Sequence, residues 1–430
     1  MSYKISQYTY ILKLDEARTV LFNGYSKQFV VVSTRQLDKY LLVLKNGDDL
    51  NKFKNKSVTA ILQDLLKANI LVDSTVNEFE RIKNNIQSYI NRNEFHTMIL
   101  PTYDCNYHCW YCIQKHQQTQ MSSNVVKLVK KHILNYLADY NIPKYILYWF
   151  GGEPLLQKQI IYELSLDVYE YCHRNNIQFV GQVTTNGALL DIPTINMLQQ
   201  VHIDNYQITL DGDKSLHDEI KHDNSPSSFE LITGNISNLL QINEKASIIL
   251  RVNYTPDSIS HLAIVDDLEK NIPLRFRSRI LVDLHKIWQV NEEDVSLEKL
   301  DLLQKKFVEK HFRLNTCGMF EPCYVEKRHF ETIYYNGKVD ICDNFAHGNA
   351  RGVITNEGYV NWGQENVFPE IPSECMGCVY YPVCLGECPA IRLKNKQQGK
   401  TFVCNASVKE HIEFAIKDYC LRTINNKKLS

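Results

Sequence analysis

The stretch CNYHCWYC, residues 105–112, decides how this chain is interpreted. It places Cys105, Cys109 and Cys112 on one short loop, directly after an apolar segment that reads as a strand. Three thiolates at this spacing can converge on one cubane [4Fe–4S] cluster and leave its fourth iron without a protein ligand. Catalytic metal sites keep such an open position for the substrate. A zinc site completed by His108 is the alternative that this loop leaves open.

The composition is that of a globular protein, with 44% hydrophobic and 23% charged residues over 430 positions. This length predicts two or three domains. Lys and Arg (48) nearly balance Asp and Glu (49), so no overall basic field favours nucleic acid or an anionic membrane as a partner. The sequence begins without a signal-like apolar segment and contains no run of about 18 apolar residues, so we expect a cytoplasmic protein without membrane spans.

The sequence contains thirteen cysteines, which is unusual for a cytoplasmic protein. Because disulfides are rare in a reducing compartment, clustered cysteines there are more often metal-binding or catalytic. The odd total also fits a disulfide scaffold poorly. Cys172 and Cys420 fall outside the clusters at helical positions, and we predict that they are buried structural thiols.

Residues 93–312 alternate between strand and helix patterns, which predicts an α/β fold. Repeated β/α units imply parallel strands joined by right-handed crossovers, here a partial (β/α)6 barrel. In such a sheet the chemistry is located at the carboxyl ends of the strands. The expected strands are 97–102, 145–150, 179–185, 206–210, 248–255 and 276–282, and the expected helices are 125–138, 159–172, 193–200, 228–242 and 261–270.

Three further motifs fall at the ends of successive strands. They are Gly151-Gly152-Glu153-Pro154 after the second strand, Thr184-Thr185-Asn186-Gly187 after the third, and Thr209-Leu210-Asp211-Gly212 after the fourth. Each alone is more often a structural turn than a site, but four motifs in order, counting residues 105–112, indicate one constellation. Together they resemble the radical S-adenosylmethionine (SAM) superfamily, and the resemblance covers residues 96–255.

The resemblance implies a chemistry and a role for each motif. The open iron is expected to be chelated by the amino and carboxylate groups of SAM, and reduction of the cluster to release a 5′-deoxyadenosyl radical that abstracts a hydrogen atom. The glycines permit close backbone approach, and a carboxylate complements an ammonium. The implied cofactor contacts are Gly151, Gly152 and Glu153 to the methionyl amino group, Asn186 near the cofactor, Thr209 to its carboxylate or ribose, and Tyr111 beside the adenine.

From residue 313 the alternation stops, and a hairpin at 332–341 followed by loops is expected. Metal clusters would supply the cross-links that a region with little apolar core needs. The cysteine spacing of residues 313–430 resembles the SPASM domain, which implies two fully ligated auxiliary [4Fe–4S] clusters. By this resemblance one cluster takes Cys317, Cys323, Cys342 and Cys388, and the other takes Cys375, Cys378, Cys384 and Cys404. Two zinc knuckles are the alternative, and residues 425–428 are expected to form a frayed, solvated end.

Residues 1–92 contain no cysteine and predict a small separate domain with a helical linker. Its expected strands are 8–14, 20–23 and 28–32, and its expected helices are 34–44, 57–68 and 77–91. This order resembles the winged-helix, PqqD-like peptide-recognition element, which implies that a leader peptide pairs as an added strand along an exposed edge. A structural extension that packs on the barrel is the alternative.

Three functions are compatible with these patterns. The first is a radical SAM/SPASM peptide maturase that forms a cross-link or thioether, or epimerises a residue, in a ribosomally synthesised precursor peptide, with a donor such as flavodoxin or ferredoxin supplying single electrons. The second is a sulfatase-maturing enzyme that oxidises Cys or Ser to formylglycine, for which Asp343, directly after Cys342, would be the catalytic base. A solvated carboxylate is an equally good interpretation of Asp343. The third is a non-catalytic zinc-binding interaction protein.

Overall fold

The computed structural model describes residues 2–45, 56–114, 116–222, 226–287, 289–290, 295–343, 350–363, 371–375, 377–386, 388–400, 404 and 406–429. The chain packs as two compact units, each assembled from segments that are distant in the sequence. Unit one comprises Met1–Asn91, Thr316–Glu326 and Phe368–Ile424, and unit two comprises Arg92–Asn315, Lys327–Val367 and Asn425–Ser430.

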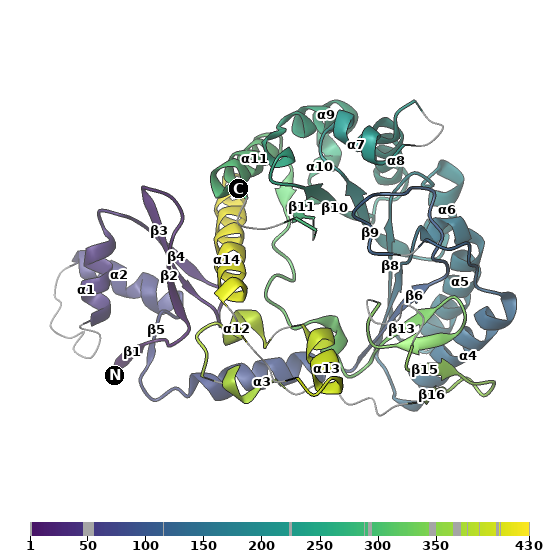
Figure 1. Cartoon of the computed structure of the whole chain (residues 1–430), viewed down its shortest axis with the longest axis horizontal. Helices are drawn as coiled ribbons and strands as arrows, with labels where there is room; N and C mark the ends of the chain where they lie inside the picture. The colour runs from purple at the N-terminus through teal and green to yellow at the C-terminus, as the bar shows by residue number, and fades with distance from the viewer. Residues whose placement is uncertain are drawn as a thin grey trace. The chain divides into compact units, whose positions relative to one another are not determined.

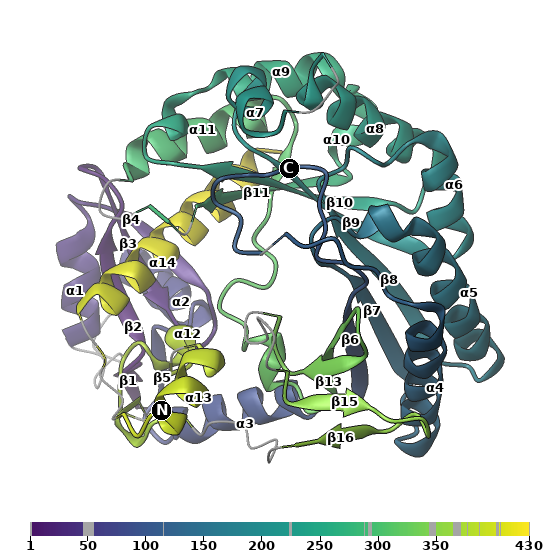
Figure 2. The same cartoon turned by 45° about the vertical axis from the view of Figure 1, so that its right-hand side comes forward.

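Unit two is built on six parallel strands that lie side by side in chain order, as Figures 1 and 2 show. The strands are β6 (Glu94–Leu100), β7 (Lys144–Trp149), β8 (Gln178–Thr185), β9 (Ile203–Leu210), β10 (Ser247–Tyr254) and β11 (Ile280–Lys286). The main helices that connect them on the outside are α4 (Ser123–Asp139), α5 (Lys158–Arg174), α6 (Ile192–Gln200), α8 (Ser228–Ile242) and α9 (Ala263–Asn271). The predicted partial (β/α)6 barrel is therefore confirmed.

Side-chain alternation and helix caps explain why these segments form these elements. On β9, Ile208 and Leu210 are fully buried, while Thr209 points to the opposite face of the strand and is half-buried. Helices α4 and α6 begin where the side chains of Ser122 and Asp191 accept hydrogen bonds from backbone amides of the first turn. The shorter elements of this part are η2 (Pro154–Gln157), α7 (Lys214–Ile220), η3 (Ser258–Ser260), α10 (Leu274–Arg277), α11 (Leu297–Glu309) and β12 (Arg313–Leu314).

The sixth strand begins later than the sequence pattern predicted. Phe276 lies in the short helix α10, and β11 starts only at Ile280. Pro273 precedes that helix, and the Arg277 guanidinium donates to the Ile272 carbonyl at 3.0 Å, so this apolar run is used in a helical turn. The prediction of a strand from residue 276 was wrong at its first four positions.

The sheet continues beyond the barrel strands through β13 (Phe330–Tyr334), which pairs parallel with β6. β14 (Lys338–Asp340), β15 (Gly352–Ile354) and β16 (Val360–Trp362) follow in antiparallel pairs. The hairpin predicted at 332–341 is confirmed, but its place beside β6 was not predicted. A buried contact anchors it, because His132 of α4 meets the Glu331 carboxylate at 2.6 Å.

The N-terminal part of unit one is a three-stranded antiparallel sheet in the order β2-β3-β4. Its elements are β1 (Tyr3–Ile5), β2 (Thr9–Lys13), β3 (Arg18–Asn23), β4 (Phe29–Ser33), α1 (Leu37–Lys45), α2 (Lys56–Lys67), β5 (Leu71–Asp73) and α3 (Glu78–Ile90). One face of the sheet packs on α1 and α2, where Leu21, Val32 and Leu65 form a shared core. The three predicted strands and the three predicted helices lie where the sequence placed them, to within a few residues, but the paired strands β1 and β5 were not predicted.

The C-terminal part of unit one is more helical than predicted. Beside η4 (Tyr324–Glu326), η5 (Ser373–Cys375), α12 (Tyr381–Cys384) and α13 (Pro389–Gln397), it contains the 21-residue helix α14 (Ala406–Asn426). This helix packs against the sheet, with Tyr419 edge-on to the rings of Phe22 and Phe29. The expectation of loops after the hairpin was therefore wrong.

The predicted frayed, solvated end is only partly correct, because Asn425 and Asn426 are held in place whereas Lys427 and Lys428 are exposed. α14 runs to Asn426 and is followed by η6 (Lys427–Leu429). Asn425 is 1% exposed, and its amide donates to Asp301 of α11 at 2.9 Å. Two polar asparagines suggested solvent exposure, but their amides are hydrogen-bonded within unit two, where Asn426 exchanges hydrogen bonds with the backbone of Leu314.

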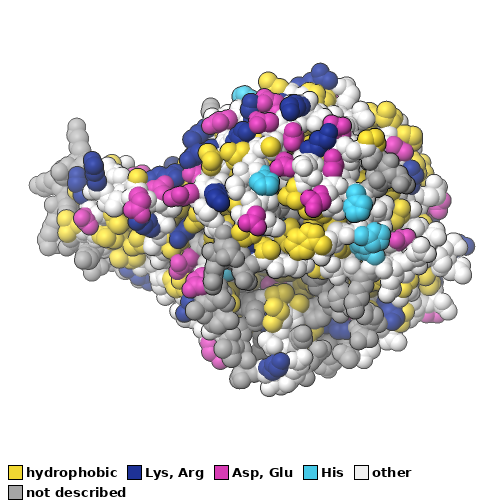
Figure 3. Space-filling model, turned by 45° about the horizontal axis from the view of Figure 1, so that its top comes forward, with side chains coloured by type: hydrophobic (Ala, Val, Ile, Leu, Met, Phe, Trp, Pro, Cys, Tyr) yellow, Lys and Arg dark blue, Asp and Glu magenta, His cyan; other side chains and the backbone are white. Residues whose placement is uncertain are grey.

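The distribution of surface charge and the apolar character of the helices bear on the expected partners. Basic and acidic side chains are intermixed over the face drawn in Figure 3, as the nearly balanced charge leads one to expect. Among the helices of the described ranges, none combines the length and the apolar character needed to cross a bilayer.

Candidate functional site

The cysteine loop follows β6 and brings the three predicted ligands together. The Cys112 amide donates to the Cys109 carbonyl at 3.0 Å, which folds the loop back on itself. Burial raises the pKa of Cys105 to about 12, and charge on Cys109 and Cys112 acts in the same direction. The three thiols of this loop therefore lie within electrostatic range of one another, which is compatible with the predicted shared cluster.

The glycine motif after β7 lies directly against the start of this loop. The Gly152 amide donates to the Thr102 carbonyl at 3.2 Å, and the Glu153 amide donates to the Asp104 carbonyl at 2.7 Å. A Cβ atom on Gly152 would overlap the Asp104 carbonyl oxygen. Gly151 adopts a φ of 125°, a conformation that L side chains rarely adopt. The close approach that these glycines permit in the structure is to the backbone of the cysteine loop.

Glu153 joins the second and third strand ends to each other. Its side chain is fully buried, and its carboxylate accepts from the Thr185 hydroxyl at 2.8 Å, the Asn186 amide at 2.8 Å and the Leu155 amide at 2.9 Å. Burial raises the pKa of Glu153 to about 7, although these donors oppose the shift. A cationic group bound nearby would favour the ionised form.

Asn186 links this carboxylate to the cysteine loop. While its backbone amide bonds to Glu153, its side-chain amide donates to Asn106 at 2.7 Å and lies 3.9 Å from the Cys105 sulfur. The structure thus places Glu153, Asn186 and Cys105 in one connected network at the carboxyl ends of β6, β7 and β8.

Tyr111 lies on the other side of the loop and takes part in a buried polar network. Its hydroxyl donates to Asp211 at 2.6 Å, and Asn253 donates to both the Tyr111 hydroxyl (3.1 Å) and the Asp211 carboxylate (2.9 Å). Lys221 forms an ion pair with Asp211, and both side chains are at most 3% exposed. Burial opposes ionisation of Asp211, but Lys221 and the adjacent donors hold its pKa below the usual value.

Sequence reasoning missed part of this network. Asp211 belonged to a quoted motif but was not assigned a role, and Lys221 and Asn253 were not singled out. The position of Asn253 near the carboxyl end of the fifth strand could have marked it, whereas nothing local marks Lys221. Thr209 takes part in this network through its backbone, because its carbonyl accepts a hydrogen bond from the Lys221 ammonium at 3.4 Å.

The hairpin that joins β6 brings the residue before Asp343 close to the end of that strand. The Tyr334 hydroxyl donates to the Cys342 carbonyl at 3.0 Å, and Tyr334 packs on Leu100 at the end of β6. Burial raises the pKa of Tyr103 to about 12, with the negative charge of Asp343 among the lesser causes. The Asp343 carboxylate therefore lies within electrostatic range of Tyr103, two residues before Cys105.

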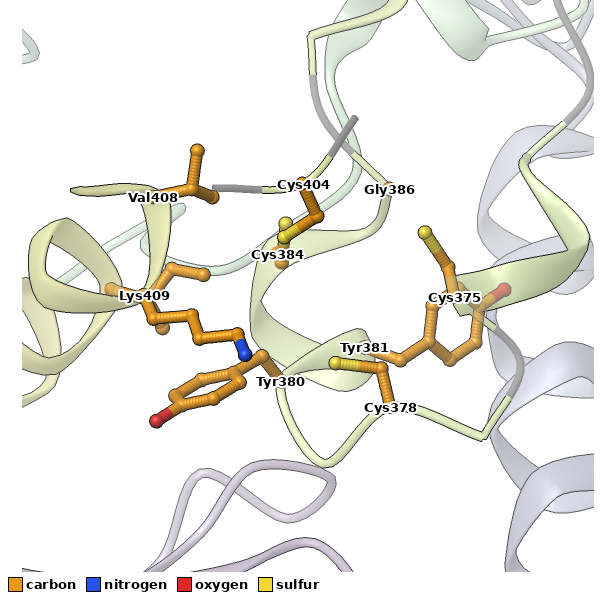
Figure 4. A pocket seen from close by; sticks show the side chains of 10 residues that line it. Cys375, Cys378, Tyr380, Tyr381, Cys384, Gly386, Cys404, Val408 and Lys409 are labelled. Carbon is orange, nitrogen blue, oxygen red and sulfur yellow. The ribbon is translucent and has the colours of Figure 1, made fainter. Parts of the chain in front are cut away.

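The second predicted set of auxiliary ligands surrounds one cavity in unit one. Cys375, Cys378, Cys384 and Cys404 line one small cavity, together with Tyr380, Tyr381, Gly386 and three residues of α14, Val408, Lys409 and Ile412. Figure 4 shows the four thiol side chains around this space, with Lys409 and Tyr380 together on one side. Four thiols around a mostly apolar cavity are a donor set that suits a fully ligated iron–sulfur cluster.

The other predicted auxiliary set is distributed over both units. Cys317, Cys323 and Cys388 belong to unit one, and Cys342 belongs to unit two, so their shared site stays a prediction. Within the described ranges, no three Cys, His, Asp or Glu side chains lie close enough together to hold a single metal ion. Cys172 and Cys420 are fully buried in α5 and α14, as predicted.

A comparison with protein families shows which family carries these strand-end motifs. Residues 99–247 match the model of the Radical SAM superfamily, and the match runs from the end of β6 to the first residue of β10 and includes all four strand-end motifs. The chain is a radical SAM enzyme. A radical SAM enzyme uses SAM and a [4Fe–4S] cluster, so the alternative of a non-catalytic zinc protein is set aside. The cysteine-rich C-terminal region lies outside the matched residues, and its resemblance to the SPASM domain stays a prediction.

Known proteins similar to this radical SAM enzyme have diverse activities. A serine-type anaerobic sulfatase-maturating enzyme of Bacteroides thetaiotaomicron is 22% identical over 365 residues, which are 69% of this chain and 82% of that protein. An Fe-coproporphyrin III synthase of Methanosarcina barkeri is 22% identical over 228 residues, 51% of this chain and 54% of that protein. The solved structure of anSMEcpe with bound AdoMet and the Kp18Cys peptide shares the fold, with a TM-score of 0.57 and 18% identity over 78% of this chain and 99% of that chain.

Proposed function

We propose that this radical SAM enzyme modifies a ribosomally synthesised precursor peptide whose leader binds the N-terminal sheet. The free edge of that sheet carries the proposal. The match to anSMEcpe covers 99% of that protein but 78% of this chain, so about a fifth of this chain is additional. Residues 1–91 are of that size and form a sheet and helices of their own.

β4 offers an unpaired edge to an incoming strand. In the described part of the chain it pairs with β3 alone. Just beyond β4, the Thr34 amide donates to the Ala17 carbonyl on the β3 side. Along an antiparallel strand, amides that point to the paired strand alternate with amides that point away from it. The amides of Val30 and Val32 therefore face β3, whereas the amide and carbonyl of Val31 face outward. A peptide strand added here would gain main-chain hydrogen bonds without disturbing the sheet.

The barrel residues would hold the cofactor and the cluster. Cys105, Cys109 and Cys112 are proposed as cluster ligands, and Glu153 and Asn186 as the residues that fix the loop beside the SAM amino group. When bound, the cluster and SAM supply the hydrogen-abstracting radical. A leader held on β4 would keep the core peptide at an effective concentration of roughly millimolar near the barrel.

The edge can be tested by substitutions at one position. Val31→Pro removes the outward amide but no β3–β4 hydrogen bond, which is the position where an edge strand tolerates proline. Val31→Ala, the matched control, trims the side chain and keeps the amide. With the precursor encoded beside the gene as substrate, we expect Val31→Pro to weaken binding by about tenfold and Val31→Ala to leave it near normal. Equal binding by wild type and Val31→Pro would refute leader recognition at this edge.

Deleting residues 1–91 would not test the same idea. Tyr8, Ile82 and Ile86 share a buried core with Cys375 and Tyr381, so the deletion would expose apolar surface around the second cysteine set. Loss of activity after such a deletion would report misfolding as readily as lost recognition. Point changes at the outer edge avoid this ambiguity.

The barrel assignment has its own test. Replacing Cys105, Cys109 and Cys112 together by Ala should reduce the iron content from roughly twelve to roughly eight per chain. It should also stop release of 5′-deoxyadenosine under reducing conditions. A triple variant that still released 5′-deoxyadenosine would contradict the assignment.

A second candidate is oxidation of a protein side chain in the manner of the sulfatase-maturating relatives. The position of Asp343 favours it, because this carboxylate lies within electrostatic range of Tyr103 at the start of the cysteine loop. A base there could take the proton of a substrate Cys or Ser. Incubation with a peptide that carries a sulfatase-type Cys or Ser, followed by mass spectrometry for an aldehyde, tests this candidate directly. Either reaction would use an external one-electron donor such as flavodoxin or ferredoxin.

A further inference from the structure

We propose that Tyr10 of the N-terminal sheet is a positioning residue for the site formed by Cys375, Cys378, Cys384 and Cys404. Retention of the cluster at that site and the order of the sheet are then coupled. The inference rests on the proposal that these four thiols hold an auxiliary cluster, and the experiments below separate the two.

The sheet contacts the loop that carries Cys375, Cys378 and Cys384 directly. The Tyr10 hydroxyl donates to the carbonyl of Val379 at 2.6 Å, and Val379 directly follows Cys378. The Tyr10 ring also packs on Tyr380, with ring centroids 5.4 Å apart. Tyr10 is 5% exposed, so this hydrogen bond is shielded from water. In Figure 4 the N-terminal segment, coloured purple, passes below Tyr380 and Cys378.

The hydroxyl of Tyr10 remains a donor over the whole range of working pH. Burial raises its pKa well above the ordinary value of 10.0, and charge on Cys378, Tyr380 and Cys384 acts in the same direction. Thiolates bound to a cluster would add to this effect, because nearby negative charge favours the protonated phenol. The bond to Val379 therefore persists when the thiols are ionised.

A second contact reinforces the first. Tyr8 is fully buried in a cluster that includes Cys375, Tyr381 and Leu385 and is completed by Ile82 and Ile86 of α3. The segment just before β2, helix α3 and the loop that carries Cys375 and Cys378 thus share one apolar core. Tyr8 belongs to this core together with Cys375, and Tyr10 of β2 bonds to Val379, so the N-terminal part holds the loop on either side of Cys378.

The loop that carries Cys375, Cys378 and Cys384 has few internal means of keeping its shape. Between Cys378 and Gly386 its regular structure is the four-residue helix α12, which ends in two successive left-handed residues, Leu385 (φ 56°) and Gly386 (φ 79°). Such a segment depends on cross-links and on neighbouring surfaces for order. Tyr10 supplies one such surface, and a bound cluster would supply the cross-link. By linkage, whatever stabilises one of the two stabilises the other.

The first experiment compares two tyrosine variants of the full chain. Tyr10→Phe keeps the ring and loses the hydrogen bond to Val379. Tyr40→Phe, the matched control, makes the same change on α1, which packs on the opposite face of the sheet. Each anaerobically reconstituted protein is challenged with a ferrous chelator, and iron release is followed over time. We expect Tyr10→Phe to lose one cluster about three- to tenfold faster than wild type, and Tyr40→Phe to match wild type.

The second experiment measures the coupling in the other direction. Hydrogen exchange of residues 9–13 and 18–23 is measured in three samples. These are the wild-type holoprotein, the wild-type protein after partial chelation, and the Cys384→Ser variant. Exchange in both segments should rise when this cluster is lost, while residues 203–210 of the barrel should not change. The wild-type comparison decides the question if Cys384→Ser does not fold.

The outcomes separate the two proposals. If Cys384→Ser retains all of its iron, the four thiols do not form the cluster site, and the inference fails with that assignment. If Cys384→Ser loses roughly four irons but Tyr10→Phe releases iron at the wild-type rate, the site is correct and the role of Tyr10 is refuted. Unchanged exchange of residues 9–13 after cluster loss would equally overturn the coupling.

Discussion

Gly152→Ala tests whether the glycine motif acts through the cysteine loop. A Cβ atom built on Gly152 would overlap the Asp104 carbonyl oxygen and stand 2.7 Å from the carbonyl oxygen of Tyr103. Ordinary contact begins at 3.4 Å, so the loop backbone must move by about 0.7 Å at Tyr103 and by more than that at Asp104. These neighbours are backbone atoms, which cannot rotate away as a side chain would.

The displacement would break the hydrogen bonds that hold the loop. The Glu153–Asp104 bond measures 2.7 Å and the Gly152–Thr102 bond 3.2 Å, and both would lengthen past useful range. Overpacking costs about 1–3 kcal/mol, and the two lost hydrogen bonds add about 1 kcal/mol each. We therefore expect a local destabilisation of about 3–5 kcal/mol, concentrated where Cys105 is positioned.

Gly234→Ala is the matched control for this substitution. Gly234 lies inside α8, and an added Cβ meets nothing within 4 Å. Alanine in a helix interior is favoured over glycine by about 0.5–1 kcal/mol, so the control should raise the unfolding temperature slightly. Gly152→Ala should lower it, bind roughly four fewer irons and release little 5′-deoxyadenosine. A Gly152→Ala protein with full iron content and wild-type melting would refute the reasoning.

Three further predictions concern the base, the hairpin and the C-terminal end. Asp343→Asn should lower turnover by about two to four orders of magnitude in a sulfatase-type reaction and leave peptide modification near normal, as product formation measured by mass spectrometry would reveal. Burial disfavours a charged His132, but Glu331 raises its pKa above 6.5, so this pair stabilises the fold below pH 6.5 and the contribution is lost as pH rises through the raised pKa. Denaturant unfolding across that range should show the decline, and a His132→Asn variant should not. Asn425→Ala should lower the unfolding free energy by about 1–3 kcal/mol because it leaves the buried Asp301 carboxylate without this donor, and calorimetry that found no change would contradict the buried role.

The sequence by itself determined the barrel and the place of its site. Repeated β/α patterns require parallel strands, and parallel strands bring their carboxyl ends to one edge. Cys105, Glu153 and Asn186 were therefore expected to lie near one another, since each follows within five residues of a strand end, and the structure joins them by hydrogen bonds. Local periodicity and strand-end position were sufficient, because both are properties of a few consecutive residues.

The tertiary structure alone decided how the remaining segments join. β13 is buried at all five positions, so its sequence carries no alternation that would predict pairing with β6. Lys221 reads as a surface lysine until its ion pair with Asp211 buries it. Tyr10 and Val379 meet across 369 residues, a contact that no local pattern encodes. Such contacts depend on which surfaces remain uncovered once the local elements have formed, and only the packed chain settles that.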